Sequence, residues 1–203
     1  MKRFGRFDLN LPRKDTIKEM KMITIDREKK IHDRTIEIST YVHEPDAVVV
    51  EGRLTDNRLR PTWYLSGECR PPGIVHDMVI RMIVRGPGLT IEAIDVEMQT
   101  VPKEDCRDVT NALQPVVGMK IRGGFTEKVK SLVGGASGCS HLVALLLAMA
   151  PAAVQGAWAA LAQNPVDRAA VSGTALKFLE NTCHVWRSDG PALKELRETL
   201  GVG

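Results

Sequence analysis

A thiol and an imidazole lie two positions apart, at Cys139 and His141, directly after a glycine-rich stretch at residues 134–138. A long apolar stretch follows, so Cys139 is expected at a helix N-terminus. Backbone N–H groups and the helix dipole favour a thiolate there, and glycine amides can hold an anion. The stretch lacks the lysine of the phosphate loop G-x-x-x-x-G-K-[ST], so it does not predict nucleotide binding. A purely structural turn is the alternative interpretation.

A second pair of candidate residues, His76 and Asp77, lies in an apolar segment at residues 74–84 that alternates like a strand. The alternation places His76 on the same face as Met78 and Ile80, and Asp77 on the opposite face. A buried imidazole needs partners for its ring nitrogens. His76 is therefore interpreted either as a core histidine with satisfied nitrogens or as a ligand.

A third candidate, Cys106, follows Pro102 at the start of an expected helix, where a thiolate is again favoured. Its alternative role is that of a small buried side chain. Cys183, beside His184, receives less weight, and Cys69 is expected in a loop and not as a ligand. No two cysteines form a C-x-x-C pair, which excludes a zinc ribbon and a thioredoxin-type motif.

The elements that must position these residues follow from the composition and the hydrophobic pattern. The chain has 203 residues, of which 43% are hydrophobic and 26% charged, which suits one domain or one and a half. Alternating segments separated by turn residues predict strands at residues 36–42, 47–54, 62–65, 74–84 and 89–98. Their short connections predict an antiparallel meander, in which Asp56 and Asn57 form a turn after the second strand.

Helical patterns begin after Pro102 and predict helices at residues 104–117, 125–133, from 139 onward, 166–181 and 191–200. The stretch from 142 to 162 approaches membrane-spanning length. Its many alanines instead favour a buried helix, kinked or broken at Pro151. Strands first and helices afterwards predict an α+β fold: an antiparallel β-meander followed by a helical C-terminal half.

Two parts are expected along the chain: a basic N-terminal arm at residues 1–33, with one strand near 22–25, and a single α+β domain at residues 34–203. No apolar run of secretory length follows the N-terminus, so a cytoplasmic protein without a membrane segment is expected. A net charge of +3 gives no warrant for nucleic-acid binding. The sequence specifies no partner and leaves open a homo-oligomer or a protein partner.

Several sequence blocks together resemble an uncharacterised bacterial domain-of-unknown-function family. They are residues 54–56, residues 74–78, Pro102-x-x-x-Cys106, and the glycine-rich block G-G-x-x-G-C-S-H-L at residues 134–142. The resemblance covers most of the chain. It implies a shared fold unit and no established activity.

A more remote resemblance is to iron–sulfur cluster scaffold proteins of the NifU N-terminal type, which have a small antiparallel sheet followed by helices. The resemblance places His76 and Asp77 at the first ligand position, Cys106 at the second, and Cys139 with His141 at the third. It implies a NifU/SufE-like core with an extra N-terminal hairpin, and a site that holds zinc or an iron–sulfur cluster. The chain departs from that family by having His where the first Cys stands, and a His that follows the third Cys.

Three functions are compatible with these residues. The first is a metal- or cluster-binding protein. The second is a metal-free enzyme of acyl or thioester chemistry, with Cys139 as nucleophile, His76 or His141 as base, and the amides of residues 134–138 as oxyanion donors. The third is a non-catalytic interaction module in which the glycines and cysteines are structural. The sequence specifies no substrate and leaves open whether the protein is an enzyme.

Overall fold

The computed structural model describes residues 23–163, 176 and 179–201, and divides the chain into two units, Met1–Lys30 and Ile31–Gly203. In the first unit the described residues form one 3₁₀ turn, η2 (Arg27–Lys29), whose N-terminus is capped by the side chain of Asp26. Residues 23–25 form no strand, so the strand expected near 22–25 is not found there. The boundary between the units falls just before the first strand of the sheet.

A four-stranded antiparallel sheet forms the centre of the second unit, in the order β1 (His32–Glu44), β2 (Ala47–Arg58), β5 (Gly73–Arg85) and β6 (Thr90–Thr100). A small hairpin of β3 (Thr62–Trp63) and β4 (Cys69–Arg70) interrupts the connection from β2 to β5. The predicted meander and α+β class are therefore confirmed. The four long strands run further than predicted, whereas the strand predicted at residues 62–65 is only Thr62–Trp63. Asp56, which is expected in a turn, lies inside β2.

The two faces of this sheet differ because side chains alternate along each strand. Even-numbered residues of β2 from Val48 to Asp56 are buried, and they share their face with Met78, Ile80 and Met82 of β5. The opposite face carries charged residues that pair across strands, such as Arg81 with Glu51 on β2 and Glu97 on β6. We call these the helix-covered face and the charged face.

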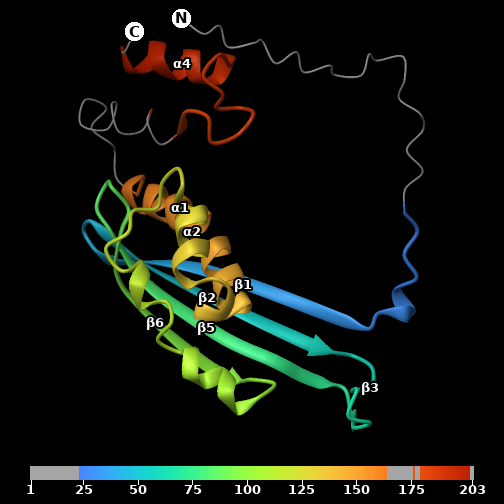
Figure 1. The fold of residues 1–203 in the computed structure, drawn as a ribbon. Helices are drawn as coiled ribbons and strands as arrows, with labels where there is room; N and C mark the ends of the chain where they lie inside the picture. Colours follow the sequence, from blue (N-terminus) through green and yellow to red (C-terminus); the bar gives the residue numbers. More distant parts are fainter. Residues whose placement is uncertain (1–22, 164–175, 177–178, 202–203) are drawn as a thin grey trace, which may run out of the picture. The chain divides into compact units, whose positions relative to one another are not determined.

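Helix α2 (Ser140–Leu161) lies across the helix-covered face, and α1 (Phe125–Val133) is on the same side of the sheet (Figure 1). Two glycines permit this close packing. A Cβ on Gly52 of β2 would lie 2.6 Å from Sδ of Met149, and a Cβ on Gly156 of α2 would overlap Thr40 of β1. The sheet and α2 therefore approach each other at positions where a larger residue has little room.

Helix α2 continues through Pro151 and is not broken there. By length and composition alone it could cross a membrane, a test that the core helix of a soluble protein also passes. Its buried residues are Leu142, Val143, Leu145, Leu146, Met149, Ala150 and Ala153. All seven belong to the same hydrophobic core as the buried residues of the helix-covered face of the sheet.

The single helix predicted at residues 104–117 is wrong, because the chain there forms two short 3₁₀ helices, η3 (Glu104–Val109) and η4 (Gln114–Val116). Their backbone bonds run to the third preceding residue, as from Val116 to Leu113. Pro115 has no N–H to donate, which disfavours a continuous α-helix through this segment. A further 3₁₀ turn, η5 (Gly135–Ser137), precedes α2.

Of the later predicted helices, that at residues 191–200 is confirmed as α4 (Pro191–Leu200). Its first residue is a proline, whose missing N–H costs nothing in the first turn of a helix. The helix predicted at residues 166–181 lies largely outside the described residues.

Candidate metal centre

Strand pairing brings three polar residues together at one end of the sheet. Asp56 of β2 is directly opposite Arg34 of β1 on one side and His76 of β5 on the other. All three therefore lie at the same level of three neighbouring strands, on the helix-covered face. A bulge follows at once, because Asn57 pairs with Ile74 and leaves Val75 as an extra residue in β5. Bulges of this kind often re-aim side chains near functional sites.

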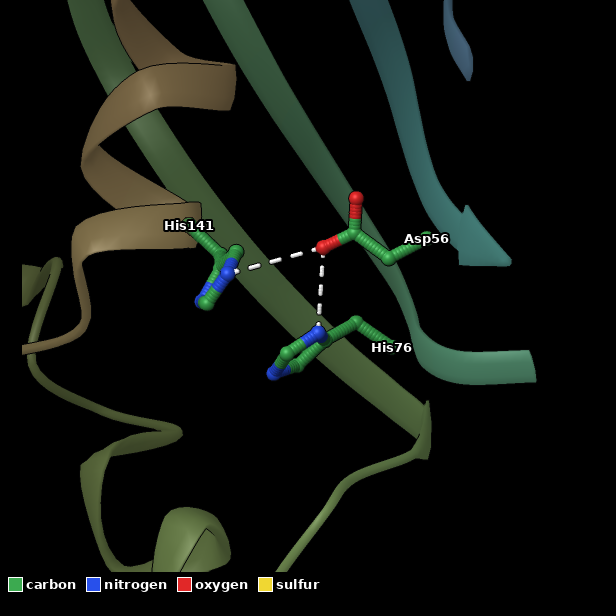
Figure 2. A group of neighbouring side chains, drawn as sticks. All are labelled: Asp56, His76 and His141. Atoms are coloured by element: carbon green, nitrogen blue, oxygen red, sulfur yellow. Dashed lines mark ion pairs between the residues drawn. The ribbon is translucent and has the colours of Figure 1, made fainter. Parts of the chain in front are cut away.

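The first turn of α2 adds His141 to this group (Figure 2). Oδ2 of Asp56 lies 3.0 Å from Nδ1 of His76 and 3.5 Å from Nε2 of His141. The two imidazole rings pack against each other with their centroids 3.9 Å apart. One ligand atom from each of the three residues lies within 4.8 Å of the other two, which makes this a candidate site for a metal ion.

Asp56 is a buried carboxylate, 3% exposed, that is held by Arg34 and lies beside His32. Arg34 donates hydrogen bonds from Nε to Oδ1 at 2.6 Å and from Nη2 to Oδ2 at 2.7 Å. Nε2 of His32 is 3.3 Å from Oδ1. The hydrogen bonds from Arg34 lower the pKa of Asp56 although burial opposes this. The carboxylate is therefore negatively charged at neutral pH.

His76 has a buried ring nitrogen that makes no well-aligned hydrogen bond. Its Nδ1 is 3.0 Å from the Asp56 carboxylate, but the geometry does not direct an N–H at that oxygen. Burial lowers the pKa of His76, and the nearby Asp56 only partly opposes this effect. Burial also lowers the pKa of His141, with His76 and Arg34 acting in the same direction. Both imidazoles are thus neutral near pH 7, the form that binds metal ions.

Cys139 lies beside the group at the N-cap of α2, where it is partly buried. Its Sγ is 3.7 Å from Nδ1 of His141, the ring nitrogen directed away from Asp56. Of the residues that the sequence singled out, His76, Cys139 and His141 are therefore brought together. The helix start predicted at this position is confirmed.

Two other residues that the sequence singled out are not brought to the group. Asp77 is on the charged face, where Arg53 donates to both of its carboxylate oxygens at 2.8 and 2.5 Å. Cys106 lies in η3 and not in the first turn of an α-helix. Among the described residues, the cluster of potential ligands contains neither of them.

Sequence reasoning missed Asp56, Arg34 and His32. Asp56 did carry a signal, because it continues the alternation of buried residues from Val48 through Leu54. A carboxylate at the next inward position of an apolar strand must find partners if it is buried. The interpretation of Asp56 as a turn residue did not require any partners for its carboxylate.

The fold and the site together define an α+β domain with one carboxylate and two imidazoles at the junction of a sheet and a helix. The chain belongs to the family described as Protein of unknown function (DUF2889), whose model matches residues 32–155. That range runs from β1 into α2 and includes Asp56, His76 and His141. The predicted membership of a domain-of-unknown-function family is confirmed.

No curated protein and no solved structure matches the chain. The resemblance to NifU-type scaffold proteins therefore receives no support from these comparisons, and the family description assigns no activity.

Proposed function

We propose that Asp56, His76 and His141 bind a divalent transition-metal ion, with Zn²⁺ as the first choice. The observation that supports this is the convergence of their ligand atoms within 4.8 Å. Zn–N and Zn–O bonds of about 2.0–2.2 Å in a tetrahedron place neighbouring ligand atoms about 3.3–3.6 Å apart. The distances of 3.0 and 3.5 Å from Oδ2 of Asp56 are already close to that separation.

Arg34 is compatible with a metal on Asp56. A carboxylate oxygen has two lone pairs, so Oδ2 can accept the hydrogen bond from Arg34 and still bind an ion. Ligating carboxylates in metal sites are commonly held by such hydrogen bonds, which fix their orientation. The misaligned Nδ1 of His76 would gain a partner in the ion.

The donor set favours a single ion over an iron–sulfur cluster. Clusters are held mainly by thiolates, and of the described cysteines only Cys139 is seen to contact the group. Two imidazoles and one carboxylate are typical ligands of catalytic Zn²⁺ and of non-haem Fe²⁺. Such a three-ligand site leaves positions for water or substrate, and the ion would supply Lewis-acid activation of either.

Metal titration tests this proposal. The full chain would be stripped with EDTA, dialysed and titrated calorimetrically with Zn²⁺, and with Co²⁺ to record its ligand-field absorption. We expect one bound ion per chain, and loss of binding in Asp56→Asn and His141→Asn variants. His184→Asn is the matched histidine control and should bind normally. A folded wild-type chain that takes up neither ion at stoichiometric level would overturn the proposal.

One arrangement favours a second function, that of a thiol enzyme. Cys139 contacts His141, and His141 in turn contacts Asp56. Sγ is 3.7 Å from Nδ1, and Nε2 is 3.5 Å from the carboxylate. This is the order of nucleophile, base and orienting acid found in thiol enzymes. In that function His141 takes the thiol proton, the thiolate attacks an acyl carbon, and the proton passes to the leaving group.

Alkylation of the metal-free chain by iodoacetamide tests this second function, with the modified cysteines identified by mass spectrometry. Cys139 should react faster than the exposed Cys183 near pH 7, and His141→Asn should abolish the difference. Equal reactivity of the two thiols would exclude it. A Zn²⁺ ion bound to Nε2 of His141 would replace the direct contact between this nitrogen and the Asp56 carboxylate. Added Zn²⁺ should therefore slow the alkylation of Cys139 if the chain has both the metal site and the thiol function.

We propose that the protein acts in the cytoplasm. This is supported by the packing of α2 on the sheet, which gives its apolar residues a use inside the domain, and by free cysteines at all four positions. Formation of disulfides in the protein isolated from cells would contradict it.

A further inference from the structure

A hollow of about 530 Å³ adjoins the candidate metal centre, between the ends of β1 and β2 and the β3–β4 hairpin. This volume is in the range of small-molecule sites. The hollow and the centre share a wall: His32 lines the hollow, and its Nε2 is 3.3 Å from Oδ1 of Asp56. Val75, the extra residue of the β5 bulge, also lines it and directly precedes His76.

Part of the lining of the hollow is aromatic. Trp63 and Tyr64 line it and remain 72% and 41% exposed, although both are large side chains. Ile31 and Val75 add aliphatic surface. Exposed aromatic surface around a concavity is a common feature of sites for planar or apolar ligands.

The lining also carries a cationic side chain. Arg58 lines the hollow and is held by a hydrogen bond from Nε to the carbonyl oxygen of Pro71 at 2.9 Å and one from Nη1 to the hydroxyl of Tyr64 at 3.4 Å. Both acceptors are neutral, so they position the guanidinium without neutralising its charge. None of the described residues that line the hollow is Asp or Glu. The positive charge of Arg58 is complementary to an anion.

We propose that the hollow binds an organic anion with an aromatic body, such as an aryl carboxylate. Its carboxylate would contact Arg58, and its ring would lie against Trp63 and Tyr64. We further assign this ligand class to the substrate of the neighbouring centre, a step that rests on the proposed metal-binding function. Binding to the hollow itself requires only the residues that line it.

The test compares 2-naphthoate with its neutral analogue 2-naphthamide, titrated calorimetrically into the full metal-free chain. A charge-assisted hydrogen bond contributes about 1.5–3 kcal/mol, so the anion should bind at least about tenfold more tightly than the amide. Arg58→Gln should remove this preference, and Trp63→Ala should weaken binding of both compounds. Arg81→Gln, which changes an arginine of the charged face, is the matched control and should keep the preference.

Equal affinity for the two compounds, or an Arg58→Gln variant that keeps the preference, would overturn the assignment of the hollow. Because Arg58 also holds Tyr64, circular dichroism and the thermal midpoint of each variant must first match those of the wild-type chain. Trp63→Ala provides a second test, since it leaves Arg58 and its bond to Pro71 in place.

Zinc titration separates this inference from the proposed function. Bound Zn²⁺ should raise the affinity for 2-naphthoate in the wild-type chain and leave it unchanged in Asp56→Asn. If zinc does not bind but the preference for the anion persists, the metal proposal and the substrate assignment fail and the anion site stands. If zinc binds without affecting naphthoate affinity, the substrate assignment is overturned and the metal centre stands.

Discussion

Each face of the sheet buries one aspartate against an arginine, yet the two sites differ in everything else around the carboxylate. Asp56 and Asp77 are 3% and 4% exposed, and Arg34 and Arg53 each donate to both oxygens of their aspartate. On the charged face, Gln99 is a further neighbour of Arg53. On the helix-covered face, three histidines lie within 3.5 Å of the Asp56 carboxylate.

The comparison shows how a structural ion pair differs from a candidate functional site. A buried carboxylate needs compensation for the water that it loses, and a two-bond arginine supplies it. Asp77 receives this compensation from Arg53. Asp56 receives the same compensation from Arg34 and also has the neutral imidazoles of His76 and His141 beside it. These imidazoles are not needed to compensate the charge, and neutral imidazole is a common metal ligand.

The largest effect should follow from removing the Asp56 carboxylate. Asp56→Asn should reduce Zn²⁺ affinity by more than about 100-fold, beyond the range for residues that only orient a ligand. Asp77→Asn makes the same chemical change on the charged face and should leave the affinity within about twofold, because Asp77 is outside the cluster of potential ligands. Calorimetric titration measures both. Similar losses in the two variants would remove the distinction between the faces.

Replacing the arginines should give a smaller effect in the same direction. Arg34→Gln removes two hydrogen bonds that orient Asp56 and should weaken zinc binding about 10- to 100-fold. Arg53→Gln is its control and should have no effect on zinc. Competition with a chromogenic chelator would measure both constants. An unchanged affinity in Arg34→Gln would mean that the pairing serves only to stabilise the carboxylate.

A disturbance of the packing of α2 on the sheet should lower the free energy of unfolding of the domain. Gly52→Ala brings a Cβ to 2.6 Å from Met149 and 3.1 Å from Leu145, so the helix or these side chains must move. We expect a loss of about 1–3 kcal/mol in the free energy of unfolding, measured by urea denaturation. Gly123→Ala, where an added Cβ would contact nothing, is the control. A Gly52→Ala variant as stable as the control would show that Met149 adapts without cost.

The smallest effect should be a dependence of metal-free stability on pH. The folded state lowers the pKa values of His76 and His141 from 6.5, so the unfolded chain binds more protons just below that pH. Their contribution is fully present above about pH 6.5 and is lost as the pH falls toward the folded values. Urea denaturation from about pH 7 to about pH 5 should show decreasing stability. His76→Asn should reduce the slope, whereas Asp77→Asn should retain it.

The sequence predicted the sheet better than the site. Alternation located the four long strands, and capping signals located α1 and α4, because these patterns are local. Strand register is not local, and it alone places Arg34, Asp56 and His76 side by side. The resemblance to NifU-type proteins placed Asp77 with His76 at one ligand position, although strand alternation predicts opposite faces for the two residues, and the structure has them on opposite faces. The prediction for Cys106 depended on an α-helix that starts near residue 104, and the chain forms the 3₁₀ helix η3 there instead.

The ligands of the proposed centre come from three elements, since two strands of the sheet, β2 and β5, supply Asp56 and His76, and the first turn of α2 supplies His141. A bound ion would therefore cross-link the sheet to the helix and close the long stretch of chain between β5 and α2. Such a cross-link restricts local opening, because the helix could not leave the sheet without losing a ligand. Amide hydrogen exchange in the first turns of α2 would then report whether the ion is bound, and the order of this helix would depend on metal supply.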